Sequence, residues 1–280
     1  PMGAAIWSCP PGRFREFPIE FILQFYRHHG LMQLRDRPQW YTIPGGSQKY
    51  VQALTAPFSD RICLNAPVQR VERGPDGVRL MTDTHDEVFD EVIFACHSDQ
   101  ALAMLADPTV AERAALSAFP YESNHVVLHY DERLLPRRRK AWAAWNYQIS
   151  PDPLRRPIVT YSMNLLQHLK SRHQFCVTLN ETDGIDEARV ISRHNYSHPV
   201  FTLRRASVQK RHVEFIRRAR TSYCGAWWGN GFHEDGVASA VRVCDAFGPH
   251  RLSSEASMLT QQQRSGDQAP PLTVGSSLHA

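Results

Sequence analysis

Apolar residues in the first part of the chain are spaced as they are in helices. Residues 16–35 carry an apolar run with this spacing, and Gly30 stands where such a helix would end. A second helical pattern covers residues 49–54 and follows the pair Gly45 and Gly46, which bends the chain. The sequence therefore predicts two helices joined by a turn.

From residue 61 the pattern changes to that of strands. A short strand is expected at residues 61–64, and residues 68–73 alternate between apolar and polar side chains. A turn at residues 74–77 leads into residues 78–81, which predicts a hairpin. Residues 87–96 end in a continuous apolar run, which is typical of a strand buried on both faces.

The rest of the chain mixes strands and helices. A helix is expected at residues 100–105, a basic helical or irregular segment at 207–220, a strand at 221–228 and a helix from residue 234. Five further segments, rich in Tyr, Trp, Val and Thr, predict a separate sheet. They are residues 125–130, 142–149, 158–163, 174–179 and 189–201. Ser, Gln, Gly and Pro dominate residues 249–280, where we expect a disordered tail.

Composition narrows the class of protein. The chain has 280 residues, 42% of them hydrophobic, which is enough for one large or two ordinary domains. The net charge of +4 is scattered except for residues 137–140, which we interpret as a solvated loop, so no nucleic-acid partner is expected. No stretch approaches about 18 consecutive apolar residues, so no stable membrane span is expected. The six cysteines form no C-x-x-C pair, which favours free thiols in a reducing, cytoplasmic setting and no metal site.

Three segments are candidates for a ligand site. Residues 227–237 form a glycine-rich turn from a strand into a helix, where amide N–H groups suit the carbonyl edge of an isoalloxazine ring or a pyrophosphate. Residues 95–99 follow a buried strand, at the edge where open α/β sheets bind ligands. Residues 37–47 contain a glycine pair. Each segment alone fits an ordinary turn or helix cap equally well, so both interpretations stay open at this point.

The order of these motifs resembles that of the flavin-containing amine oxidoreductases. Gly45-Gly46-Ser47 comes first, then Val68 in a strand, then residues 91–95, and finally residues 231–237. The sequences of the motifs are similar to those of a bacterial subgroup described as NAD/FAD-binding proteins. The match runs from residue 1 to about residue 247. Together the motifs are specific.

The resemblance implies an α/β fold of mixed α+β character. In it a truncated FAD-binding, Rossmann-like domain is interleaved with a substrate domain on a mixed sheet. Its implied parts are a helical part of the substrate domain with the entry to the FAD domain at 1–56, an FAD-binding segment at 57–123, a substrate-binding domain at 124–215, an FAD-domain return strand and helix at 216–248, and the tail at 249–280.

The resemblance also implies cofactor contacts. Val68 would meet the adenine of FAD through its backbone, Phe232 would flank the flavin ring, and His233 would offer a backbone N–H to a flavin carbonyl. The implied set of cofactor-binding residues is Gly45, Gly46, Val68, Gly225, Gly231, Phe232, His233, Gly236 and Val237. No catalytic residue is assigned.

Two departures from the family pattern bear on function. The chain has no G-x-G-x-x-G segment, which in this family opens the flavin domain and cradles the pyrophosphate, so we expect a truncated chain. Gly225 is followed by Ala226, where many relatives carry an acidic residue.

Two functions therefore remain open. The first is an FAD-dependent oxidoreductase that removes a hydride from a C–N or C–C bond of a small or lipid-like substrate. The second is a non-catalytic fragment or interaction remnant that binds no flavin. A nucleic-acid or membrane-surface binder using residues 137–140 is a weaker third, and the oligomeric state is left open.

Overall fold

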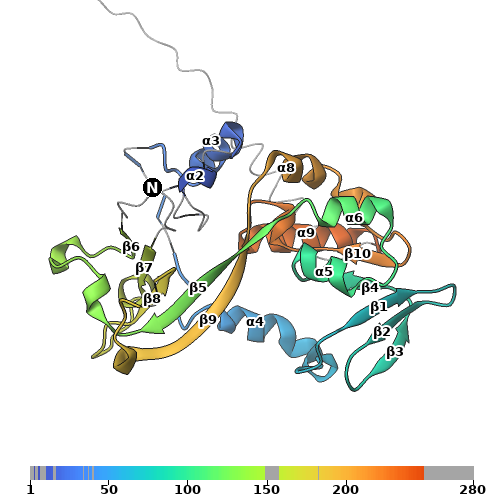
Figure 1. Cartoon of the computed structure of the whole chain (residues 1–280), viewed down its shortest axis with the longest axis horizontal. Coiled ribbons are helices and arrows are strands. Elements are labelled where there is room, and N and C mark those ends of the chain that lie inside the picture. The colour runs from blue at the N-terminus through green and yellow to red at the C-terminus, as the bar shows by residue number, and fades with distance from the viewer. Residues whose placement is uncertain are drawn as a thin grey trace, which may run out of the picture.

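The structure is a computed structural model in which two sheet regions lie at opposite ends of the molecule (Figure 1). The long strands β5 (Tyr121–His129) and β9 (Val190–Pro199) run from one region toward the other. The helices and strands of the chain and their arrangement confirm the predicted α/β class with α+β character. The described residues are 3, 6, 11–14, 17–33, 35–36, 38–39, 41–148, 158–181 and 183–248.

The first region, called here the α/β layer, is built on two parallel strands. β4 (Val92–Phe94) pairs with β10 (Thr221–Tyr223), with Phe94 opposite Tyr223. The rings of these two residues stack 5.3 Å apart, and both are almost fully buried. The surrounding helices are α5 (Ser98–Met104), α6 (Val110–Leu116), α8 (Leu203–Gln209) and α9 (His233–Asp245), with 3-10 turns η5 (His212–Phe215) and η6 (Ala226–Trp228).

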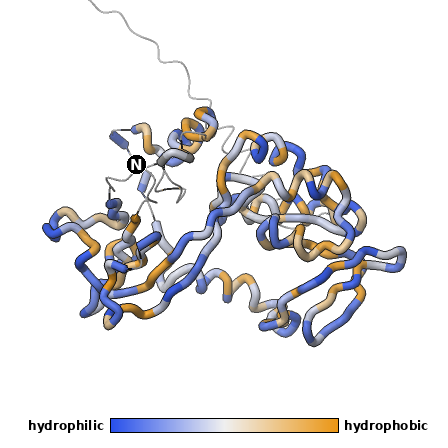
Figure 2. Tube along the Cα trace, in the orientation of Figure 1, coloured by the Kyte–Doolittle hydropathy of each residue, from blue (hydrophilic) through white to orange (hydrophobic). Residues whose placement is uncertain are grey.

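A small antiparallel sheet projects beside the α/β layer. It contains β1 (Arg70–Arg73), β2 (Val78–Met81) and β3 (Asp86–Phe89), and the β1–β2 pairing confirms the predicted hairpin. Hydrophobic and hydrophilic residues are interspersed along it (Figure 2), and β3 is exposed at every position. The single strand predicted at 87–96 is wrong, because β3 pairs with β2 whereas β4 pairs with β10. Ile93 is 44% exposed, so β4 is not buried on both faces.

Two other strand predictions need correction. The strand expected at 61–64 is absent: Arg61 ends the 3-10 helix η1 (Ala56–Arg61), and Leu64 is 79% exposed in a turn. Pro57 near the start of η1 favours a helical turn there. The strand expected at 221–228 is only three residues long, because Gly225 takes a positive φ that a strand does not allow.

The second region is a five-stranded sheet in the order β6-β7-β8-β5-β9. Besides β5 and β9 it contains β6 (Trp145–Gln148), β7 (Ile158–Ser162) and β8 (Cys176–Leu179), which confirms the five strands predicted here. Every pairing between these strands is antiparallel, so the expected mixed sheet is wrong in this detail. A parallel pairing of β6 and β7 would need a crossover of about a dozen residues or more, and their connection is shorter. Short helical segments of the region are η2 (Glu132–Leu134), η3 (Arg139–Ala141), α7 (Met163–Gln167) and η4 (Glu187–Arg189).

The amino-terminal helices lie between these regions. α2 (Pro11–Phe14) precedes α3 (Ile19–His28), and α4 (Gln48–Thr55) follows the glycine pair, as predicted for residues 16–35 and 49–54. α3 buries Phe25 in a small cluster that includes Phe17, Val200 and Phe201. This cluster fastens α3 to the segment that leads from β9 into α8.

Some predictions fall outside these elements or stay untested. The tail expected at 249–280 lies outside the described residues. The domain boundaries stay predictions. Within the described residues, no helix has the length and apolar character needed to cross a membrane.

Candidate cofactor-binding site

The candidate site lies at the carboxyl ends of β4 and β10. Because the register aligns Tyr223 with Phe94, both strands end at the same edge. The amide N–H of Cys224 donates to the carbonyl of Phe94 (2.8 Å), and the indole N–H of Trp227 donates to the carbonyl of Cys96 (2.9 Å). The segments that follow the two strands are thus tied together where open α/β sheets bind their ligands.

Gly225 makes the turn that leaves β10. Its φ is +153°, and a Cβ there would lie 2.5 Å from the indole nitrogen of Trp227, so only glycine fits without displacing the ring. Ser239 of α9 fastens this turn. Its hydroxyl accepts the N–H of Gly225 at 2.8 Å and lies within donating distance of the carbonyls of Gly225 and Gly236. The start of α9 is therefore fixed relative to the end of β10.

The amino end of α9 is open to solvent. Residues 231–234 are exposed. The Asp235 carboxylate accepts the N–H of Phe232 at 2.9 Å, and the first bond inside the helix runs from the N–H of Gly236 to the carbonyl of Phe232. The amides of the first three residues of α9, His233 to Asp235, therefore have no partner within the helix. They stand at the positive end of the helix dipole, available to a ligand.

The glycines between β10 and α9 differ in whether a side chain could replace the hydrogen at their Cα. Gly231 has a φ of +95°, a conformation that other residues rarely adopt. Gly236 lies inside α9, where a Cβ would meet the backbone of Ala226 at an ordinary 3.7 Å, so sterics do not require glycine. Gly229 was not in the predicted set, yet a Cβ there would collide with the Asp235 carboxylate. Close backbone approach is thus needed at the turn rather than in the helix.

Aromatic residues of α3 meet this turn. The Phe232 ring, 38% exposed, stacks on Phe25 with ring centres 5.4 Å apart, and the His29 ring lies 5.6 Å from it. Phe25 and His29 stack on each other at 4.0 Å. Sequence reasoning missed both residues, although their spacing of four places them on one helix face.

A second helix contacts the same turn. The Tyr50 hydroxyl on α4 lies 2.8 Å from Nδ1 of His233. This contact brings the segment after the glycine pair to the start of α9, as expected if both segments belong to one site. Tyr50 was missed as well, because nothing in a short helical pattern marks it.

The predicted residues are only partly brought together. Those from β10 to α9 form one continuous turn: Gly225, Gly231, Phe232, His233, Gly236 and Val237. Gly45 and Gly46 have φ values of +82° and +83°, and Gly45 lines a separate cavity of about 640 Å³ with residues 166–170. Val68 packs against the main core of the α/β layer.

Trp228, the second tryptophan of the turn, is held by a neutral histidine. His212 stacks on Trp228 at 4.1 Å, and its Nε2 lies 2.7 Å from the Tyr223 carbonyl, so Nε2 carries the proton and donates. Nδ1 then accepts from Arg242 at 3.0 Å. Burial lowers the pKa of His212 to about 4, against the Tyr223 hydrogen bond and helped by the Arg242 charge.

The thiol at the end of β10 is not a nucleophile at neutral pH. Burial raises the pKa of Cys224 to about 11, with smaller contributions from Cys244 and Cys96. The described residues of the turn thus offer amide donors, an aromatic face and a fixed backbone. These properties suit the binding of a flat ligand.

Parallel strands that end in a glycine turn and an open helix terminus, beside a separate antiparallel sheet, define an α/β protein with a second layer. Open α/β sheets commonly bind their ligands at this edge. A family model for flavin-containing amine oxidoreductases matches residues 6–160, more than half of the chain. The chain therefore belongs to the flavin-containing amine oxidoreductase family, as the resemblance predicted.

Relatives agree with this membership. A putative flavin-containing monoamine oxidase, AofH, of Mycobacterium tuberculosis is 26% identical over 149 residues, which are 52% of this chain and 30% of that protein. Among solved structures, a CLA-producing fatty acid isomerase from P. acnes has a TM-score of 0.59 at 15% identity, covering 88% of this chain and 63% of that one. Cyclohexylamine oxidase from Brevibacterium oxydans has a TM-score of 0.52 at 12% identity, covering 83% and 60%. The match to AofH thus spans about a third of that relative's length, and the structural likenesses show the fold alone.

Proposed function

We propose that the protein is an FAD-dependent oxidoreductase of the amine-oxidase type, and that the β10–α9 turn binds the flavin ring. The observation that carries the proposal is the exposed amino end of α9, where amides without a partner in the helix stand beside the Phe232 ring and the positive-φ Gly231. Amide donors suit a ring carbonyl, and glycine lets a flat ligand approach the backbone closely.

The charge of this helix end supports a ring carbonyl over a phosphate. Glu234 and Asp235 lie in the first turn of α9 and stabilise the helix dipole. Their negative charges repel a phosphate but act weakly on an uncharged carbonyl edge. The residues present therefore fit the ring end of a flavin, whereas the sequence offers no G-x-G-x-x-G cradle for its pyrophosphate.

The chain's own residues orient the ring and its substrate. A bound flavin supplies the hydride-accepting chemistry. The amides of α9 would hold one edge of the ring, and Phe232, Phe25 and His29 give the site an aromatic wall. We propose a C–N or C–C bond of a small or lipid-like molecule as the site of oxidation, since the adjoining sheet and this wall are rich in aromatic side chains.

Flavin titration of the purified 280-residue chain tests the proposal. Riboflavin, FMN and FAD should each bind, with similar affinities, if only the ring end is held by this chain. A chain that binds none of them and purifies without absorbance at about 450 nm, the flavin band, would contradict it.

A pair of glycine variants locates the site. Gly231→Val forces a branched side chain into a φ of +95° and should reduce flavin binding by about tenfold or more. Gly184→Ala is the matched control, because a Cβ there meets only the flexible Glu181 side chain at 3.4 Å or more. Equal loss in both variants, or none in Gly231→Val, would place the flavin elsewhere.

The alternative function is a non-catalytic chain that binds no flavin. Pyrophosphate contacts normally contribute much of the binding of a dinucleotide, and residues 1–280 contain no G-x-G-x-x-G segment to make them. The same titration separates the two functions, and an in-frame G-x-G-x-x-G segment upstream of residue 1 would favour the enzyme.

A further inference from the structure

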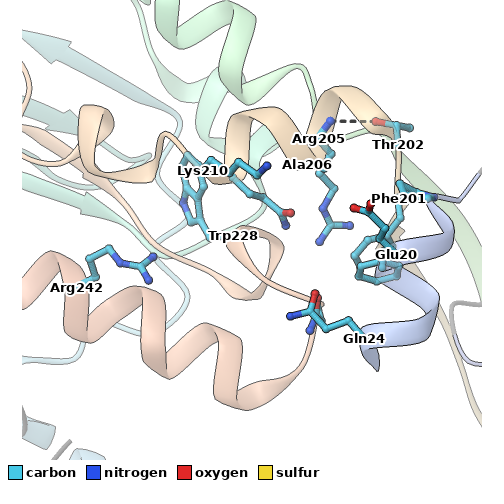
Figure 3. A pocket seen from close by; sticks show the side chains of 13 residues that line it. Glu20, Gln24, Phe201, Thr202, Arg205, Ala206, Lys210, Trp228 and Arg242 are labelled. Atoms are coloured by element: carbon cyan, nitrogen blue, oxygen red, sulfur yellow. Dashed lines mark hydrogen bonds between the residues drawn. The ribbon is translucent and has the colours of Figure 1, made fainter. Parts of the chain in front are cut away.

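A second cavity, which borders the proposed ring-binding turn at Trp228 and Asn230, is lined by three cations. Its volume is about 380 Å³, within the range of small-molecule sites. It lies between α3, α8 and α9 (Figure 3). The cations are Arg205, Lys210 and Arg242, and Glu20 is the one carboxylate among the lining residues, all of which are described.

Arg205 is buried at the wall of this cavity, with only 1% of its surface exposed. Its Nη2 donates to the carbonyls of Trp227 (3.2 Å) and Gly229 (2.8 Å). Its Nε and Nη1 are buried without a hydrogen-bond partner. Among the described residues, no carboxylate lies within ion-pair distance of it. A buried charge without a counter-ion is costly, so its presence calls for an explanation.

The surroundings of Arg205 keep its charge effective. Its guanidinium lies 3.5 Å from the ring centre of Phe201, which itself stacks on Phe21 of α3 at 4.4 Å. Burial lowers the pKa of Arg205 to about 9, against smaller opposing effects of Tyr121 and Asp235, so the group stays protonated at neutral pH. A charge shielded from water acts more strongly on its neighbourhood than an exposed one.

The other walls of the cavity are apolar or amide-bearing. Phe21, Phe201 and Trp228 give it a ring-lined side, and Gln24 and Asn230 add neutral polar groups. Figure 3 shows the Arg205 and Lys210 side chains directed toward the space that Phe201 and Gln24 border. The lining therefore combines an excess of positive charge with an apolar face.

We propose that this cavity binds a small monocarboxylate with an apolar body. The carboxylate lies in the field of Arg205, Lys210 and Arg242, and the apolar body packs against the rings of Phe21, Phe201 and Trp228. Arg205 acts mainly through its charge, because its unpaired atoms have no exposed surface. One carboxylate in the lining disfavours a multiply charged ligand such as phosphate.

Calorimetric titration of the purified 280-residue chain, without flavin, tests the proposal. The probes are octanoate, its neutral analogue octanol, its cationic analogue octylamine, and inorganic phosphate. Octanoate should bind about tenfold or more tightly than octanol, because a charge-assisted interaction is lost. Equal binding of octanol would show an apolar cavity only, and tighter binding of phosphate would overturn the ligand class.

Variants of the lining locate the binding site. Arg205→Gln should weaken octanoate binding about tenfold, and Lys210→Gln, at an exposed position, about two- to fivefold. Arg138→Gln makes the same charge change on an exposed loop outside the cavity and should have no effect. Unchanged binding in a folded Arg205→Gln would contradict the proposal.

Arg205→Gln could lose octanoate binding because it misfolds, so a second variant that should bind octanoate more tightly is needed. Glu20→Gln removes the one carboxylate of the lining and should tighten octanoate binding about two- to fivefold, which a damaged fold cannot imitate. Weaker or unchanged binding in this variant would overturn the proposal. Because no flavin is present, failure here leaves the ring-binding turn untouched, and failure of the flavin titration leaves this cavity untouched.

Discussion

The α/β layer and the five-stranded sheet are built on different principles. The core of the α/β layer is apolar and aromatic, with Phe94, Phe119, Tyr223, Trp227 and Trp228 all nearly fully buried. The interior of the sheet instead buries polar side chains on facing strands: Asn124, His129, Asn146, Thr160, Ser162 and Thr178. Ring packing fixes the backbone of an exposed binding turn, whereas side-chain hydrogen bonds fix the register of strands. Function is therefore expected at the edge of the first region, and rigidity within the second.

A directed chain of hydrogen bonds illustrates the sheet. The N–H of Asp131 donates to Nδ1 of His129 at 3.1 Å, so the ring proton lies on Nε2. Nε2 then donates to the Thr178 hydroxyl at 2.7 Å, and the Thr178 and Thr160 hydroxyls are hydrogen-bonded to each other at 2.9 Å. Burial lowers the pKa of His129 despite the nearby Asp131 charge, which keeps this arrangement neutral.

Among the described residues, one buried ion pair joins the small β1–β3 sheet to the α/β layer. Arg73 of β1 and Glu112 of α6 meet at 2.6 Å with side chains 6% and 5% exposed, and the Tyr223 hydroxyl donates to the same carboxylate at 2.9 Å. Burial works to raise the pKa of Glu112, but hydrogen bonds from Arg73 and from the Thr109 amide outweigh it, and the pKa lies below its usual value.

The largest expected effect comes from breaking this pair. Glu112→Ala should lower the free energy of unfolding by about 3–5 kcal/mol, because it leaves Arg73 buried without its main partner. Urea unfolding followed by tryptophan fluorescence measures it. Glu214→Ala removes an exposed partner of Arg211 and should cause no measurable change. Equal losses in the two variants would show that burial does not govern these pairs.

Acid should weaken the α/β layer through His212, the second largest effect. The pKa of His212 falls from 6.5 to about 4 on folding, so below about pH 6.5 the unfolded chain takes up a proton that the folded chain refuses. The free energy of unfolding should thus fall as the pH decreases through this window, by about 2 kcal/mol at pH 5.

A non-titrating variant isolates this contribution. His212→Gln can still donate to the Tyr223 carbonyl and accept from Arg242, and should flatten the pH dependence of urea unfolding between pH 7 and pH 5. His85→Gln, on an exposed turn, should leave the dependence unchanged. An unaltered slope in His212→Gln would assign the acid sensitivity to another group.

A third, smaller effect tests the sheet. Thr178→Val removes the acceptor of His129 and the hydrogen-bond partner of Thr160, and should cost about 1–3 kcal/mol of unfolding free energy. Thr178→Ser keeps the hydroxyl and should recover most of that loss. If Ser is as damaging as Val, the methyl group rather than the hydrogen-bond chain stabilises this position.

The elements that sequence predicted well are those with local signals. The β1–β2 hairpin has its turn residues between two alternating runs, and α9 starts directly after a glycine turn. The division of residues 87–96 between two sheets could not be predicted, because the choice of partner strand is not encoded locally. The antiparallel order of the five strands was missed for the same reason.

The candidate site shows the same limit. The glycine-rich turn into a helix predicted at 227–237 is continuous in sequence, so a local pattern indicates it. Phe25, His29 and Tyr50 reach it from distant helices and were not predicted, because only packing brings them there. Arg205 fell between the strand predicted at 189–201 and the basic segment predicted at 207–220, and only its burial without a counter-ion distinguishes it from its exposed neighbour Arg204.

The variant with the smallest expected effect on stability tests whether the Ser239 hydroxyl positions the flavin-binding turn or only stabilises the fold. Ser239→Ala removes the hydroxyl that accepts the N–H of Gly225, and should cost only about 1 kcal/mol of unfolding free energy. The same variant should lose a larger fraction of its flavin-binding free energy than of its unfolding free energy, because the turn that carries Gly231 is then no longer fixed to α9. Ser207→Ala, a matched change on the exposed face of α8, should alter neither quantity. If Ser239→Ala lowers stability but leaves flavin binding unchanged, the hydroxyl supports the fold of the α/β layer and the ring is held by other residues.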